Sequence, residues 1–286
     1  MEHLRWTSRP ALRRPVVIAA FEGWNDAGDA ASTAARWLRD RWAPRQFAEI
    51  DPEEFFDFTS TRPQVRIEDG VRRIDWPRNE LYAGADAGRD VVVLLGNEPQ
   101  LKWRTFCEEV VTVARELEAE MLITLGALLA EVPHTRPTSV MATGTDQSLT
   151  ERFEMQPSQY EGPTGIVGAL QDACRQAGVP TASLWAAVSA YVPGAPSPKA
   201  ALALVERTAA VLDVPIVATD LEIASAAYER QVTEVVEDDE EMTDYLERLE
   251  QAYDEDDRVP SPASLVEEVE RFLRDQRPPG SSAEMP

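Results

Sequence analysis

Short apolar runs alternate with helical periods along the first 220 residues, and this alternation limits the folds that the chain can adopt. The runs are rich in β-branched residues, as buried strands are, and they occupy residues 16–21, 91–95, 121–125, 184–188 and 216–218. Apolar residues at helical spacing separate them, at residues 34–38, 106–117, 166–177 and 202–212. Alternating strands and helices predict an α/β fold with helices on both faces of a mostly parallel central sheet.

Composition divides the chain into four parts. We expect residues 1–14 to be an N-terminal extension, 15–219 an α/β core, 220–276 an acidic helical appendage and 277–286 a disordered tail. In the appendage, apolar residues from Leu221 to Leu249 fall on one helical stripe. A second amphipathic helix is predicted after residues 260–262, with Leu265, Val266, Val269, Phe272 and Leu273 on its apolar face.

One segment inside the core has a different pattern. Residues 65–67 and 71–74 flank Asp69-Gly70, a dipeptide that predicts a tight hairpin turn. Arg72 and Arg73 would suit a nucleic-acid-binding ribbon, but carboxylates lie beside them in the sequence. The pattern therefore favours a solvated strand face.

Net charge excludes whole classes of partner. The chain has 28 basic and 51 acidic residues, a formal net charge of -23, so it repels nucleic acids and anionic membranes. More than half of this charge lies in residues 229–257, which contain 14 acidic and 2 basic residues. That tract is either a solvated helix face or a surface for a basic partner. No apolar window reaches the length of a membrane span, and we expect a cytoplasmic protein.

Residues for metal or covalent chemistry are few. His3 and His134 are the only histidines, and Cys107 and Cys174 lie in apolar helical patterns that favour buried, reduced thiols. These four residues do not form the usual zinc spacing, and we expect no metal site and no cofactor, although a magnesium site made of carboxylates stays open. The sequence contains no P-loop, no G-x-G-x-x-G and no G-x-S-x-G.

Polar loops follow the apolar runs, at the edge of the sheet where open α/β folds bind ligands. The candidate residues for a pocket or a subunit interface are Gly23, Trp24, Asn25, Asp26, Gly28, Glu98, Trp103, His134, Arg136, Glu161, Gly162, Thr164 and Gly165. Free amides at the helix start after Gly165 would favour an anion such as phosphate. Glu98 could act as a base. His134, which is beside Arg136, could act as an acid and base, or it could be a structural residue. Asp26 or Asp29 could cap the helix that follows them, and capping is the favoured role of Asp29.

Four motifs carry a family resemblance. They are F-E-G-W-N-D-A-G-D-A-A at residues 21–31, G-N-E-P at 96–99 with Trp103, P-H-T-R-P at 133–137, and Y-E-G-P-T-G at 160–165. With them the chain resembles the proteasome assembly chaperone 2 family, in an actinobacterial branch, over residues 15–228. The acidic appendage lies largely beyond this region.

The resemblance implies a three-layer α/β/α sandwich similar to nucleoside phosphorylases, self-association into small oligomers such as trimers, and proteasome subunits as partners. Eukaryotic members dock on the proteasome through a carboxyl-terminal hydrophobic-Tyr-X tail. This sequence ends in Ala283-Glu284-Met285-Pro286, and its Tyr253 is internal, so the resemblance does not extend to that tail.

Two kinds of function compete at this stage. The family and the acidic tract favour a non-enzymatic assembly or interaction protein. The alternative is a protein or enzyme that binds a small molecule, such as an anion or a nucleoside-like compound, with the loops at the carboxyl edge of the sheet. In a third, simpler interpretation the loop residues build only an oligomer interface, with Trp24 and Trp103 as anchors.

Overall fold

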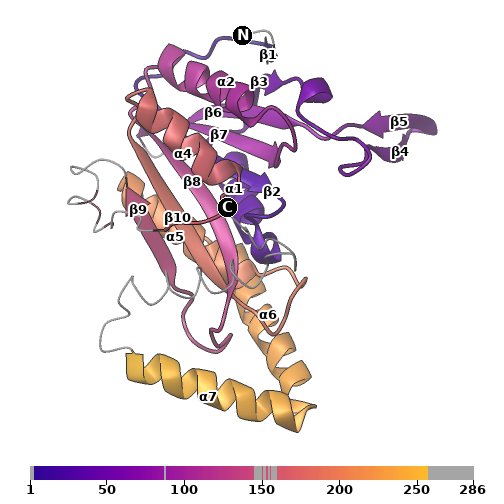
Figure 1. The fold of residues 1–286 in the computed structure, drawn as a ribbon, viewed down its shortest axis with the longest axis vertical. Helices are drawn as coiled ribbons and strands as arrows, with labels where there is room; N and C mark the ends of the chain where they lie inside the picture. Colours follow the sequence, from indigo (N-terminus) through magenta and orange to yellow (C-terminus); the bar gives the residue numbers. More distant parts are fainter. Residues whose placement is uncertain are drawn as a thin grey trace, which may run out of the picture.

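Four buried strands form the centre of the molecule, as the apolar runs predict. The computed structural model describes residues 3–86, 88–144, 150, 153, 155 and 160–256. Within them β7 (Arg89–Asn97), β2 (Val16–Glu22), β8 (Met121–Ala130) and β10 (Thr181–Ser189) are neighbours in this order, and each of the three pairings is parallel. Figure 1 shows β8 and β10 running toward the C-terminal helices.

The outer strands are antiparallel, so the sheet is mixed and not mostly parallel as predicted. β1 (Leu4–Trp6), β3 (Arg45–Ile50) and β6 (Asn79–Asp86) extend it beyond β7, and β9 (Val140–Gly144) pairs with β10, giving eight strands within the described residues. β6 and β7 are joined by two residues, a connection that permits only antiparallel pairing.

One predicted strand is absent. Residues 216–218 connect α5 to α6 without entering the sheet. Pro215 precedes them and lacks the N–H that a ladder needs, and Val217 is exposed.

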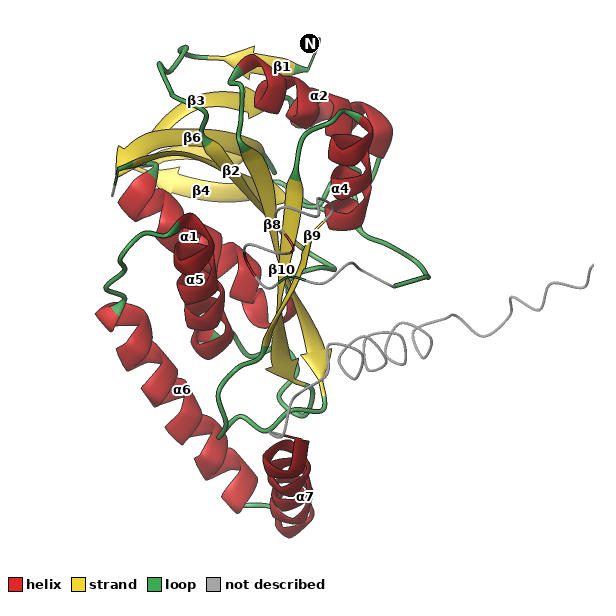
Figure 2. Ribbon diagram, turned by 90° about the vertical axis from the view of Figure 1, so that its left-hand side faces the viewer, coloured by secondary structure: helices red, strands yellow, loops and turns green. Residues whose placement is uncertain are grey.

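Helices cover both faces of the sheet. α1 (Ala30–Trp42) and α5 (Pro198–Leu212) pack on one face, and α2 (Trp103–Glu116) and α4 (Ile166–Gln176) on the other, each pair with its own apolar core (Figure 2). The helical periods of the sequence predict all four. Ser197 accepts a hydrogen bond from Ala200 N–H (3.3 Å) and Pro198 begins α5, which confirms the predicted start of that helix.

The appendage is a pair of helices, α6 (Thr219–Glu237) and α7 (Glu240–Asp256), which we call the acidic arm. α6 packs on α5, extends past the sheet and turns at residues 238–239 into α7, which lies beyond the carboxyl ends of β8 and β10 (Figures 1 and 2). The second predicted amphipathic helix and the predicted tail lie outside the described residues. Among the helices that are described, none is long and apolar enough to cross a bilayer.

The predicted hairpin is confirmed. β4 (Gln64–Glu68) and β5 (Val71–Asp75) form a separate antiparallel sheet, which we call the ribbon, and it projects from the body of the molecule (Figure 1). Asp69 and Gly70 have φ angles of 51° and 77°, as the tight turns of such ribbons require. Two short 3₁₀ helices, η1 (Ala27–Asp29) and η2 (Pro52–Glu54), complete the chain's regular elements in the described part.

Candidate functional site

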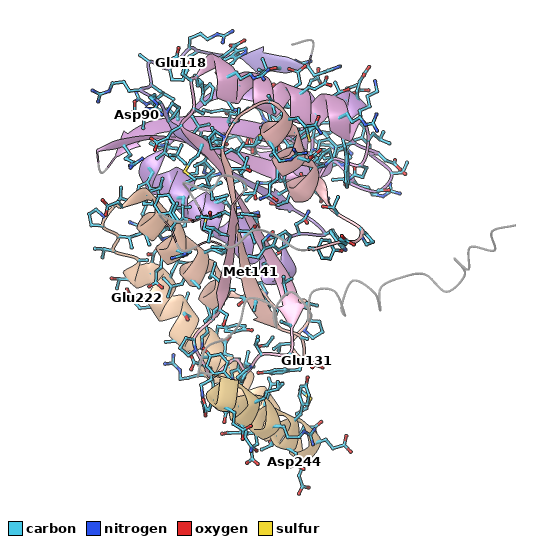
Figure 3. The ribbon with its side chains drawn as sticks, turned by 60° about the vertical axis from the view of Figure 1, so that its left-hand side comes forward. Asp90, Glu118, Glu131, Met141, Glu222 and Asp244 are labelled. Atoms are coloured by element: carbon cyan, nitrogen blue, oxygen red, sulfur yellow. The ribbon has the colours of Figure 1, made fainter. Side chains whose placement is uncertain are left out.

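A cavity of about 510 Å³ opens at the carboxyl ends of β2, β8 and β10. It lies on the sheet face that carries α4, beyond the N-terminus of that helix, where Trp185 of β10 and Met141 of β9 project from the sheet (Figure 3 labels Met141). Its wall is formed by residues 23–28, 127–129 and 162–165 together with Met141, Thr143, Tyr160, Gly168, Gln171, Trp185 and Gly194. This is the edge of the sheet where an α/β fold is expected to hold a ligand.

Most of the predicted site residues meet at this cavity. Those in its wall are Gly23, Trp24, Asn25, Asp26, Gly28, Gly162, Thr164 and Gly165. They come from two loops that are far apart in the sequence, the loop after β2 and the loop before α4. Aromatic and apolar side chains line much of the rest of the cavity, while Asn25 and Asp26 are buried polar groups at its edge.

Glu98 ties these two loops together. Its Oε1 accepts hydrogen bonds from Asn25 Nδ2 (3.0 Å) and Ile166 N–H (2.9 Å), and its Oε2 accepts one from Trp24 N–H (3.3 Å). The free amide at the start of α4, predicted to attract an external anion, therefore already binds an internal carboxylate. The Glu98 carboxylate is thus a structural connection between the loop after β2 and the start of α4.

Asp26, and not Asp29, caps α1. Asp26 Oδ1 accepts hydrogen bonds from Ala31 N–H (2.7 Å) and Ser32 N–H (3.1 Å). Asp29 occupies the position before the helix but has a φ of 50° and makes no side-chain capping bond. The favoured prediction for Asp29 is therefore wrong and the alternative, Asp26, is confirmed, because the 3₁₀ turn of η1 places the capping residue three positions upstream.

Burial makes the charge of Asp26 costly. The residue is 6% exposed and its Oδ2 has no hydrogen-bond partner within the described residues. Desolvation raises the pKa of Asp26 above its ordinary value of 3.8, although the bonds from residues 31 and 32 oppose the increase. The folded protein therefore holds this proton to a higher pH than the unfolded chain does.

A pH dependence of stability follows from this shift. As pH rises from the ordinary pKa of 3.8 through the raised pKa, the unfolded chain loses the proton first, so the Asp26 contribution to folding stability declines and then becomes constant. Asp26→Asn removes the titration and keeps the acceptor oxygen. We expect the free energy of unfolding of the wild type, relative to Asp26→Asn, to fall over this pH range in urea titrations. A difference that rises with pH would contradict the assignment.

Glycine is required at two positions in the wall of the cavity. A Cβ on Gly165 would lie 2.4 Å from Asn25 Nδ2 and 2.5 Å from its Oδ1. Gly28 has a φ of +59°, and a Cβ there would come within 3.0 Å of Ser197 Cβ. Both glycines thus allow the close approach of loops that form the cavity.

His134 and Arg136 do not reach the cavity; they bind the acidic arm. His134 Nε2 lies 2.9 Å from Thr233 Oγ1 of α6, and its Nδ1 lies 2.7 Å from the Tyr191 hydroxyl. Arg136 forms a two-bond ion pair with Asp254 of α7 (2.8 and 2.7 Å) and a further bond to Glu250 (3.2 Å). Of the two interpretations that the sequence left open for this pair, the contacts favour the structural one, because both residues dock the two helices.

The surroundings of the His134 ring favour its neutral form. The Thr233 hydroxyl donates to Glu229 O, so it accepts from Nε2–H, and Nδ1 is left to accept from Tyr191. Burial first, and Lys199 second, lower the pKa of His134. Lys199 also donates to the carbonyl of His134 and to Glu229 Oε2 (3.0 Å), which joins α5 to the same network.

Trp103 and Glu161 lie outside the wall of the cavity. Trp103 donates its indole N–H to Pro99 O (2.5 Å) and packs, half-buried, against the core under α2 and α4. Glu161 is exposed. Within the described residues, no three His, Cys, Asp or Glu side chains are grouped closely enough to hold a metal ion.

Sequence analysis missed Met141, Thr143, Trp185 and Gln171 in the wall. Met141 and Thr143 alternate on β9, whose five half-buried residues do not form an apolar run. Trp185 lies within a predicted strand, and as the only aromatic residue of that strand it could have indicated a special position. Gln171 belongs to the predicted helix of α4, one turn after Gly168.

Comparison with known proteins shows which family the chain is similar to. The model of the PAC2 family matches residues 20–236. A PAC2 family protein from Streptomyces avermitilis is 45% identical, with a TM-score of 0.76, over 81% of this chain and 99% of that one. A proteasome-assembly chaperone homologue from Mycobacterium tuberculosis is 44% identical, with a TM-score of 0.73, over 81% of this chain and 99% of the other.

A second Mycobacterium tuberculosis protein, of unknown function, is 29% identical with a TM-score of 0.84 and covers 96% of each chain, so the likeness includes most of the acidic arm as well. Among curated proteins no match was found. The matched residues include most of the sheet from the end of β2 onward, the cavity loops and nearly all of α6. The chain belongs to the PAC2 family.

Proposed function

We propose that this chain is a non-enzymatic interaction protein of the assembly-factor type, and that the exposed acidic face of α7 binds a basic surface on its partner. α7 carries eight acidic residues and one basic residue. Asp244 and Glu247 are exposed on it, and Figure 3 shows Asp244 at the far end of the molecule from Glu118. An exposed cluster of one sign steers a partner of the opposite sign.

The observation that carries this proposal is the network that holds the arm to the core. His134 bonds Thr233 of the arm, and Lys199 bonds Glu229. Arg136 bonds both Glu250 and Asp254. A second contact is apolar, where Tyr228, Val232 and Val236 pack against Tyr191, Val192, Met242 and Leu246. A solvated helical tail would need no such network, whereas a recognition surface must be held in one orientation.

Four of the side chains that could perform covalent or acid–base chemistry are engaged elsewhere or chemically inert. Burial raises the pKa of the Cys107 and Cys174 thiols to about 12, so neither forms a nucleophilic thiolate at neutral pH. Glu98 accepts three N–H bonds, and both ring nitrogens of His134 are bonded. This disposition favours binding over chemistry.

The family names of relatives suggest which partner to test. One relative at 44% identity is described as a proteasome-assembly chaperone homologue. We therefore propose unassembled proteasome core subunits as the first partners to examine. The binding would be electrostatic and would weaken as salt is added.

The test is a binding titration with purified, unassembled core subunits. Asp244→Asn with Glu247→Gln removes two exposed charges from α7, and we expect about a tenfold loss of affinity at low salt, from about 0.5–1 kcal/mol for each charge. Glu108→Gln with Glu118→Gln makes the same charge change at the other end of the molecule and is expected to leave affinity unchanged. Equal effects of the two pairs, or no binding by the wild type, would refute the proposal.

The cavity supports a second candidate function. A volume of about 510 Å³ with Trp24, Tyr160 and Trp185 in its wall suits a small flat molecule with an apolar ring. Native mass spectrometry of the purified chain would reveal such a compound as added mass. If it is bound there, Trp185→Ala should release it and Trp103→Ala should not, because Trp103 lies outside the wall.

A further inference from the structure

The wall of the cavity contains polar groups that bind no other part of the described chain. Gln171 of α4 is half-buried in this wall, and its side-chain amide has no hydrogen-bond partner among the described residues. The indole N–H of Trp185 has no partner there either. Further along α4, by contrast, the amide of Gln176 bonds Asp172 (2.6 Å). The wall therefore offers both N–H donors and a carbonyl acceptor to a ligand.

The described part of the wall has no group that would pair with an anion. It includes no Lys, Arg or His, and Asp26 is its only acidic residue. Burial raises the pKa of Asp26, which disfavours a charge on that side chain. The amide at the start of α4, which would attract an anion, is bonded to Glu98. An anion in the cavity would lose hydration without gaining an opposite charge, so the wall suits an uncharged ligand.

Aromatic side chains give the cavity flat apolar surfaces. Trp185 of β10 lies opposite Gly126 of β8, and a Cβ on Gly126 would lie 2.6 Å from Trp185 Cε3. The glycine therefore allows the indole ring to lie close against the neighbouring strand. Trp24 is 45% exposed, although its backbone N–H is bonded to Glu98 (3.3 Å). A planar ligand would cover aromatic surface that is now in contact with water.

We propose that the cavity binds an uncharged, planar nitrogen heterocycle with a lactam edge, in which an N–H lies beside a C=O, and that Gln171 recognises this edge. The inference rests on the second candidate function, the binding of a flat molecule in the cavity. The amide of Gln171 presents an N–H and a C=O in one plane, so it can form two parallel hydrogen bonds with a lactam. The ring of the ligand packs against Trp24 and Trp185. Gln171 thus determines specificity, and the aromatic residues supply affinity.

Isothermal titration calorimetry of the full chain with four bicyclic probes tests this proposal. Carbostyril has the lactam edge, and quinoline has the same two rings without it. Naphthoate and N-methylquinolinium are flat probes of similar size with a negative and a positive charge. We expect carbostyril to bind at least about tenfold more tightly than each of the other three, the gain that one or two hydrogen bonds provide.

Two variants of α4 assign the preference to Gln171. Gln171→Leu should weaken the binding of carbostyril about tenfold, to the level of quinoline, and leave the binding of quinoline unchanged. Gln176→Leu is the matched control, because it makes the same substitution on the same helix at an exposed residue outside the wall. We expect it to leave the affinity for both probes unchanged. Circular dichroism should show the same fold for both variants.

The possible failures are distinguishable. If quinoline or a charged probe binds as tightly as carbostyril, the inference is overturned, while the second candidate function stands. An equal loss of both probes in Gln171→Leu would overturn it too, because Gln171 would then contribute only to the shape of the cavity. Binding of none of the four probes would overturn the inference and remove the support for the second candidate function. Recognition through α7 would be unaffected, because it uses a separate surface.

Discussion

Replacing Glu98 with alanine is expected to lower the free energy of unfolding by about 2–4 kcal/mol. The substitution removes the acceptor of three hydrogen bonds and leaves the Ile166 amide and the Asn25 side chain, both buried, without that partner. It also removes a negative charge from the N-terminus of α4. Urea unfolding with linear extrapolation measures the change.

Glu98→Gln separates the stability contributed by the negative charge of Glu98 from that contributed by its hydrogen bonds. The glutamine keeps one acceptor oxygen, which can serve the Ile166 amide, so we expect it to retain about half of the lost stability. Glu108→Gln provides a control for loss of an exposed carboxylate on α2. If Glu98→Ala costs no more than this control, the link between the two loops does not contribute to the fold.

Gly165→Ala is expected to destabilise the protein by about 2–4 kcal/mol, because the new methyl group overlaps the Asn25 side chain. The backbone of Gly165 (φ -91°, ψ -173°) is accessible to alanine, so the cost is steric and not conformational. Asn25 is 2% exposed and bonded to Glu98, and it cannot move aside without breaking that bond.

A double-mutant cycle checks this cause. Asn25→Ala removes the atoms that the new methyl group would contact, so Gly165→Ala should cost much less in that background than in the wild type. Equal cost in both backgrounds would show that the glycine is needed for another reason. The same pair of variants should alter the shape of the cavity, since both residues lie in its wall.

The central strands could be predicted from the sequence because burial on both faces leaves a continuous apolar run. β2, β7, β8 and β10 all have this pattern. The antiparallel strands β6, between β3 and β7, and β9, at the edge of the sheet, are buried less uniformly and mix polar with small residues, so no periodicity distinguishes them from loops. The prediction of a mostly parallel sheet was wrong because it missed these strands.

The location of the site could be predicted, but its internal bonding could not. Strand ends in an α/β fold meet at one edge, and most candidates do meet there. The partners that decide their roles are distant in sequence: Glu98 bonds Ile166, and His134 bonds Thr233. Local spacing contains no information on such pairs, so it could not decide between the chemical and the structural interpretations of Glu98 and His134.

Amide hydrogen exchange of the chain, alone and saturated with unassembled proteasome core subunits, tests the central claim most directly. The account predicts new protection on α7, centred on the turns that carry Asp244 and Glu247, with the loops at residues 23–28 and 160–165 unchanged. Protection confined to those loops, or the same footprint after Asp244→Asn with Glu247→Gln, would contradict recognition through the acidic arm.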